Sequence, residues 1–94
     1  MRLWASSRRR AAVDSALAAY VEWRRECDAV RAAYSTWRSA RALDEPRAFD
    51  AFKAALDREE SAAVLFARRM RRAHRLAETG VALQLAQGHT GFGT

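Results

Sequence analysis

The sequence predicts an all-α fold, an antiparallel two-helix hairpin of coiled-coil type, and three observations lead to this prediction. Residues 1–79 contain no glycine, and the chain has a single proline, Pro46. The chain has 22 Ala and 16 Arg residues, which propagate helices, whereas Gly and Pro interrupt them. Apolar residues recur at heptad spacing on both sides of Pro46. A short break between two such segments makes the helices antiparallel neighbours.

The first helix is predicted over residues 7–42, after an N-terminal extension at residues 1–6. The hydroxyls of Ser6 and Ser7 can cap its free N–H groups. With heptad positions lettered a to g, the a positions are Val13, Tyr20, Cys27 and Tyr34, and the d positions are Ala16, Trp23, Val30 and Trp37. The segment 18–24 (AAYVEWR) returns two heptads later at 32–38 (AAYSTWR), so both copies present the same face.

The second helix is predicted over residues 46–79. It follows Leu43-Asp44-Glu45-Pro46, where Pro disfavours the helical conformation of the residue before it and suits the first turn of a new helix. Its a positions are Phe49, Leu56, Ala63, Met70 and Ala77, and its d positions are Phe52, Glu59, Phe66 and Ala73. Gly80 is predicted to cap this helix, which leaves residues 80–94 as a flexible tail with a possible short helical turn.

If the chain reverses near residue 44, the numbers of facing residues add to about 89, which pairs Trp37 with Phe52 and Trp23 with Phe66. The predicted helix–helix seam consists of Tyr20, Trp23, Val30, Tyr34, Trp37, Phe49, Phe52, Leu56, Phe66 and Met70. Apolar residues such as Leu17 and Val64 widen the stripe beyond a two-helix contact. We therefore expect a four-helix bundle, completed by dimerisation or by another helical protein.

The net charge of +6 is concentrated at the open end of the predicted hairpin. Residues 1–19 and 65–80 together carry nine arginines and two acids, a formal charge of +7. The candidates for binding nucleic acid or an acidic partner are Arg8, Arg9, Arg10, Arg68, Arg69, Arg71, Arg72 and Arg75. An anionic membrane surface, reached through residues 1–4, is a less favoured partner. A merely solvated basic surface remains the alternative to all three.

No catalytic, metal-binding or nucleotide-binding motif is present, so we expect neither an enzyme, a cofactor nor a small-molecule substrate. Glu59 at a core-type position is expected to pair with Arg31 or to accept a hydrogen bond from Tyr34. Cys27 is interpreted as a small buried side chain, with a redox role as the alternative, and a single cysteine fits a reducing cytoplasm. The aromatic stripe favours a core over a platform for stacking bases.

The function predicted from the sequence is a non-enzymatic helical protein–protein interaction module. The alternative is a small basic nucleic-acid-binding accessory protein that uses the arginine-rich end. In size and plan the chain resembles the helical-hairpin proteins exported by type VII secretion, which pair into four-helix bundles. Leu43-Asp44-Glu45-Pro46 stands where that family carries Trp-x-Gly, so the resemblance concerns the architecture alone.

Overall fold

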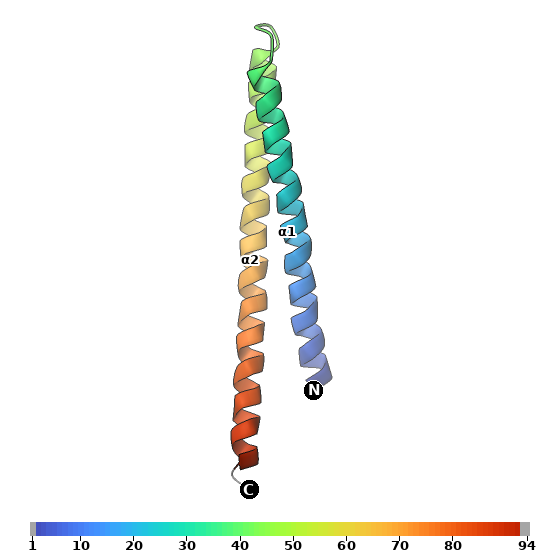
Figure 1. Cartoon of the computed structure of the whole chain (residues 1–94), viewed down its shortest axis with the longest axis vertical. Helices are drawn as coiled ribbons and strands as arrows, with labels where there is room; N and C mark the ends of the chain where they lie inside the picture. Colours follow the sequence, from blue (N-terminus) through green and yellow to red (C-terminus); the bar gives the residue numbers. More distant parts are fainter. Residues whose placement is uncertain (1, 93–94) are drawn as a thin grey trace.

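The computed structural model describes residues 2–92, excluding the side chains of residues 2, 3, 5 and 88–92. Two antiparallel helices, α1 (Arg2–Arg38) and α2 (Glu45–Phe92), are joined by a loop at residues 39–44, as Figure 1 shows. The described residues contain no strand, so the predicted all-α hairpin is confirmed. Its extents are 79 × 17 × 13 Å and its radius of gyration is 21.6 Å, against about 12 Å for a compact domain of this length.

The loop ends one helix and caps the next through its backbone. The backbone N–H of Ala48 donates to the carbonyl of Asp44 at 3.0 Å, so α2 starts directly after Asp44 and Pro46 lies in its first turn, as predicted. The predicted end of the first helix at residue 42 is wrong by four residues. Ala40 donates to Trp37 at 3.2 Å, a three-residue spacing that tightens and ends the helix.

The predicted start of the first helix and the predicted end of the second were also wrong. The expected extension at residues 1–6 is helical from Arg2, so Ser6 and Ser7 lie inside α1 and do not cap it. Gly80 lies inside α2, where no described glycine has a positive φ, and the expected tail is helical through Phe92. A glycine costs a helix only about 1 kcal/mol, which good helix formers on both sides can offset. Residues 93 and 94 lie outside the described part of the chain.

The closest approach of the two helices is lined by alanines. Among the side chains that the structure describes, five are buried: Ala12, Ala16, Ala19, Ala48 and Ala55. All except Ala16 occupy heptad position g. The contact between α1 and α2 is therefore centred between positions d and g, and the expected a/d seam was wrong in this respect. Alanine has no bulk beyond Cβ, so the helix axes can approach each other most closely along these rows.

Larger side chains pack beside the alanine rows in two aromatic clusters. Near the loop, Trp37 stacks on Phe52 with a centroid separation of 5.4 Å, and its ring lies 5.0 Å from that of Phe49. Further along, Trp23 stacks on Phe66 at 5.7 Å, and Tyr20 contacts the same ring at 5.4 Å. Both predicted pairs, Trp37 with Phe52 and Trp23 with Phe66, are confirmed. These ring contacts between the helices fix the register of α2 along α1.

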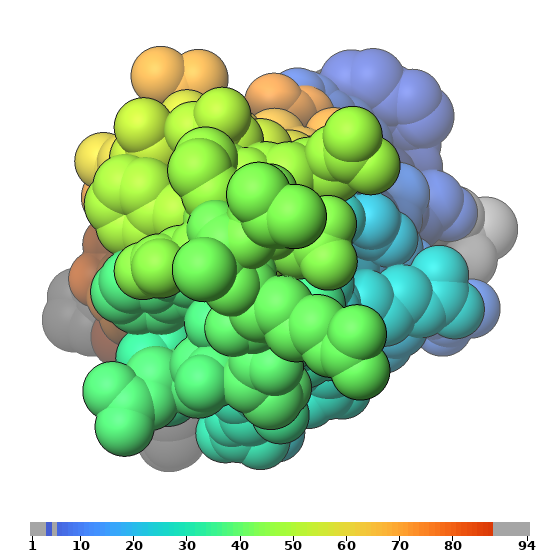
Figure 2. Space-filling model, turned by 90° about the horizontal axis from the view of Figure 1, so that it is seen from above, coloured from blue at the N-terminus to red at the C-terminus, as the bar shows by residue number. Residues whose placement is uncertain are grey.

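The helices separate toward the open end. Figure 1 shows the gap between the ribbons widening from the loop to the N-terminus, and α2 continuing beyond α1. Viewed down the long axis onto the loop in Figure 2, the N-terminal part of α1 (blue) and the C-terminal part of α2 (red) emerge on opposite sides. The helices nevertheless pack against each other in the half toward the open end, because Ala12, Ala16 and Ala19 are buried there.

The alanine rows generate a first testable prediction. Ala55→Leu adds bulk where the side chain is 1% exposed, so it should force the helices apart and lower the free energy of unfolding by about 1–3 kcal/mol. Ala54→Leu, at the exposed neighbouring position, adds the same bulk and should stay within about 0.5 kcal/mol of the parent. Urea unfolding followed by circular dichroism measures both. Equal losses in the two variants would contradict the alanine-centred contact.

Candidate helix-pairing surface

The offset of the contact toward position g makes the two long sides of the hairpin chemically different. Because the helices are antiparallel, position a of both helices lies on one side, and position c of both lies on the other. Side chains at a on this first side include Val13, Tyr20, Tyr34, Phe49, Leu56 and Met70, which are each 37–49% exposed. We call this side, with its flanking e and b positions, the apolar face.

Most of the exposed apolar surface gathers on the apolar face. The described part of the chain has fifteen large apolar side chains that are exposed, and eleven of them occupy a, e or b positions. Besides the six above, these are Leu17, Val21, Val64, Val81 and Leu85. Scattered exposed leucines need no explanation, but a run of them along one side of both helices is typical of a surface that another molecule covers.

An open groove of about 550 Å³ runs along the apolar face between the helices in the half toward the open end. Its walls are formed by Val13, Ala16, Leu17 and Tyr20 from α1 and by Phe66, Met70, Ala73 and His74 from α2. A second apolar hollow continues from His74 along α2 past the end of the first groove, to Val81 and Leu85. Together the two hollows extend along the helices, where a row of side chains from a third helix could pack.

The opposite side of the hairpin is polar and is bridged between the helices. A guanidinium nitrogen of Arg69 donates a hydrogen bond to the hydroxyl of Ser15. Nε of Arg58 lies 3.4 Å from Oε2 of Glu26, an oxygen that is buried and lacks a partner with hydrogen-bond geometry. The first of these contacts satisfies polar groups within the hairpin, whereas the oxygen of Glu26 is held by an ion pair alone.

Glu59 forms the one polar bridge within the aromatic rows that the described residues show. Its Oε1 accepts a hydrogen bond from the indole N–H of Trp23 at 2.8 Å and lies 4.0 Å from the thiol sulfur of Cys27. The expected pairing of Glu59 with Arg31 or Tyr34 was wrong, because Arg31 lies 3.7 Å from Asp28 in its own helix. Glu59 lies nearer to Trp23 than to Arg31 or Tyr34, because the contact between the helices is centred between positions d and g.

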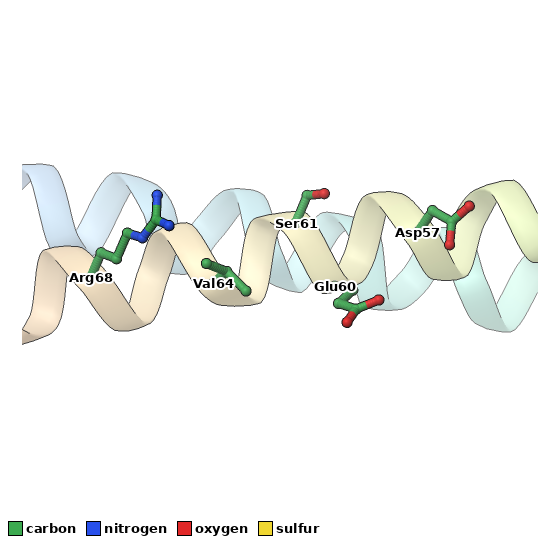
Figure 3. A pocket seen from close by; sticks show the side chains of 5 residues that line it. All are labelled: Asp57, Glu60, Ser61, Val64 and Arg68. Atoms are coloured by element: carbon green, nitrogen blue, oxygen red, sulfur yellow. The ribbon is translucent and has the colours of Figure 1, made fainter.

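The outer edge of α2 carries acidic side chains beside the apolar face. Figure 3 shows Asp57, Glu60, Ser61, Val64 and Arg68, all from α2, with α1 passing behind it. The five surround a shallow, open hollow on the surface. Its open shape and mixed charge do not make a small-molecule site, but the acids mark one border of the apolar face.

The eight candidate arginines are exposed except Arg9 and Arg69, which are half-buried. Arg8 lies over the ring of Trp4 at 4.8 Å, and Arg9 donates to the hydroxyl of Ser6 at 3.2 Å. The guanidinium of Arg9 also crosses Gly80 on α2, where an added Cβ would overlap it. Within the described residues, none of the eight candidate arginines forms an ion pair with a carboxylate.

The placement of the remaining candidates is mixed. The seam residues Trp23, Val30, Trp37, Phe52 and Phe66 are half-buried, whereas the other five are exposed on the apolar face. Half-buried Cys27 lies among them, and the side chains of residues 1–3, which the membrane hypothesis invokes, lie outside the described part. No described helix has the length and apolarity needed to cross a membrane, and no described cluster of three His, Cys, Asp or Glu residues could hold a metal ion.

Comparison with protein-family models, with curated proteins and with solved structures finds no match to this chain. Its function must therefore be inferred from the surface just described. The a positions were placed in the seam from the sequence, and Tyr20, Tyr34 and Phe49 do contact rings of the other helix. The sequence pattern did not predict that the large side chains at these positions remain 37–49% exposed. The signal was present in the buried alanines at position g, which recur every seven residues at Ala12 and Ala19 and at Ala48 and Ala55.

The polar bridge gives a second prediction. Glu59→Ala removes the acceptor of the Trp23 N–H and should lower the free energy of unfolding by about 1–2 kcal/mol. Glu59→Gln keeps an acceptor oxygen at the same reach, so most of the stability should return. Urea unfolding measures both, and the tryptophan emission of Glu59→Ala should shift because one indole changes its surroundings. If Gln and Ala were equally destabilising, the hydrogen bond would not be the source of the effect.

Proposed function

We propose that this chain is a non-enzymatic helical interaction module whose apolar face is covered by another helical chain, either a second copy or a different protein. The observation that supports this most is the gathering of eleven exposed large apolar side chains on one side of the hairpin. The other side carries the polar bridges at Ser15 and Glu26, so the two sides are suited to different surroundings.

The amount of exposed surface supports the same proposal. The chain exposes 7651 Å², whereas a compact monomer of 10.6 kDa exposes about 5,500 Å². The excess of about 2,000 Å² is larger than the roughly 800 Å² that each partner buries in a standard interface. The only buried side chains in the described part are alanines, which contribute little apolar area per residue. A lone hairpin therefore has a thin core, and a covering chain would supply the missing layer.

A dilution series tests whether the chain depends on a partner. We expect the chain at nanomolar concentration, and without other proteins, to lose helicity and to unfold over a broad temperature range, because a two-helix layer alone is marginal. Circular dichroism in a long-path cell, or the emission of Trp23 and Trp37, follows the change. A nanomolar monomer with full helicity and a sharp, concentration-independent melt would contradict the proposed function.

A second candidate function, polyanion binding by the open end, is favoured by the arginines that lack carboxylate partners there. A formal charge of +7 gathered at one end attracts phosphates, and the mechanism is counterion release without sequence preference. The arginines spread around α2, since Arg68, Arg71 and Arg72 point in different directions at 100° per residue. Arginines spread in this way suit loose contact with phosphates better than the recognition of bases by one helix face in a groove.

Fluorescence anisotropy with a labelled mixed-sequence duplex tests the second candidate. If three phosphates are neutralised, affinity should fall about 40-fold between about 50 and 200 mM salt. Replacing exposed Arg68, Arg71 and Arg72 by Ala should abolish binding. The control replaces exposed Arg25, Arg41 and Arg47 by Ala, which removes the same charge far from the open end. Equal losses in the two triple variants, or no binding at about 50 mM salt, would exclude this candidate.

A further inference from the structure

The two borders of the apolar face carry opposite charge. Along the e and b positions of α1 between residues 24 and 38, three arginines stand against one acid, Asp28, for a net charge of +2. Along the same positions of α2 between residues 50 and 64, three acids stand against Lys53, for a net charge of −2. The residues are Arg24, Arg31 and Arg38 on α1 and Asp50, Asp57 and Glu60 on α2.

These two stretches lie at the same height of the hairpin. The observed ring contacts join residues whose numbers add to 86 or 89, and the same relation sets residues 24–38 of α1 level with residues 50–64 of α2. At that spacing Arg31 is level with Asp57, and Arg38 is level with Asp50. Val21 and Val64, which are 49% and 46% exposed, are level at the next b positions. The two borders thus lie at the same height, carry opposite net charges and each include an exposed valine.

Within one chain the two borders face away from each other, so the match cannot serve the hairpin itself. A second hairpin laid face to face can be placed in two symmetric ways. A twofold axis parallel to the helices sets α1 of one copy on α2 of the other, with both loops at the same end. A twofold axis across the helices sets α1 on α1 and α2 on α2, with the loops at opposite ends. The first brings opposite borders together. The second, with the hairpins overlapping over their full length, sets residues 24–38 against the N-terminal half of the partner copy's α1, so the borders do not meet.

We infer that the occupant of the apolar face is a second copy of this chain, placed with both loops at the same end so that the border of α1 meets the acidic border of the partner copy's α2. This inference rests on the proposed function and names its partner. The opposite charges of the two borders favour this orientation against the repulsion of the open ends, while the apolar residues at position a supply the buried area. The arginine-rich open ends of both copies lie side by side, so added polyanion or salt relieves their repulsion.

The loop provides a direct measure of the orientation. Leu43 is 96% exposed in the loop and lies outside the apolar face, so a spin label there leaves the contact intact. In a full-length Cys27→Ala, Leu43→Cys chain, the inferred dimer places the labels about 20–30 Å apart, because neighbouring helix axes are about 8–10 Å apart. Loops at opposite ends would be at least about 50 Å apart, since α1 with its 37 residues spans about 55 Å.

Double electron–electron resonance, with light scattering on the same sample, gives distance and mass together. A dimer with a distance near 25 Å supports the inference. A dimer with a distance above about 50 Å overturns the orientation. A chain that stays monomeric and only partly helical at high concentration overturns the second copy as partner, but leaves the proposed function standing with a different helical protein. A fully helical, stable monomer overturns both.

Charge reversal tests the borders themselves. Arg31→Glu with Arg38→Glu, or Asp50→Arg with Asp57→Arg, should each weaken the dimer at least about tenfold because like charges then meet. The chain that carries all four changes should recover most of the affinity, because its borders are again opposite. In the arrangement with loops at opposite ends, these borders do not meet each other, so loss of affinity in the double variants followed by recovery in the chain with four changes is not expected. Absence of recovery therefore overturns the inference even if a dimer forms.

A matched pair of leucines tests which side is covered. Leu56 at position a and Leu65 at position c are 40% and 41% exposed, so a lone hairpin would respond equally to their replacement by Gln. If the apolar face is the contact, Leu56→Gln should weaken the dimer about fivefold, whereas Leu65→Gln should leave it within about twofold. Sedimentation equilibrium measures both constants. Equal effects, or a larger effect at Leu65, would overturn the assignment of this face.

Discussion

The close approach of α1 and α2 along their alanine rows is the constraint on which the rest of this structure depends. Because Ala12, Ala19, Ala48 and Ala55 occupy position g, the helices meet between d and g instead of between a and d. That rotation brings the aromatic rings at d beside the contact and moves the a positions of both helices outward on one side. The exposed apolar face is therefore a geometric consequence of the small residues at position g.

The same rotation accounts for the division of polar groups. Positions c and g meet on the side opposite the apolar face, and there Arg58 reaches Glu26 and Arg69 reaches Ser15 across the gap. The ion pair between Arg58 and Glu26 is partly exposed and contributes about 0–1 kcal/mol, so it does not hold the helices together by itself. These bridges make this side more polar than the apolar face, so a second layer gains most on the other side. Because one side of the hairpin is polar and the other is apolar, a partner is expected to bind on the apolar side.

Most of the fold was predictable, and the face available to a partner was not. The absence of glycine before residue 80, the heptads and Pro46 predicted two antiparallel helices. The expectation that the numbers of facing residues add to about 89 correctly paired Trp37 with Phe52 and Trp23 with Phe66. The helix ends were predicted poorly, because Gly80 costs little inside a long helix and Ser6 caps nothing when the helix already begins at Arg2. The heptad pattern predicts which residues are apolar. The size of the residues at position g determines how each helix is rotated about its own axis relative to its neighbour.

Glu59 shows why a partly polar contact can specify one register. In the observed register its carboxylate accepts the Trp23 N–H. A slip of one heptad in either direction would bring Glu59 to Ala16 or Val30, neither of which has a side-chain donor. The carboxylate would then leave the Trp23 N–H, and Trp23 would lose its acceptor, which adds a cost to a slipped register. Alanine rows alone tolerate sliding because every step looks alike, so a single acid among the aromatic rings supplies the specificity that the small residues lack.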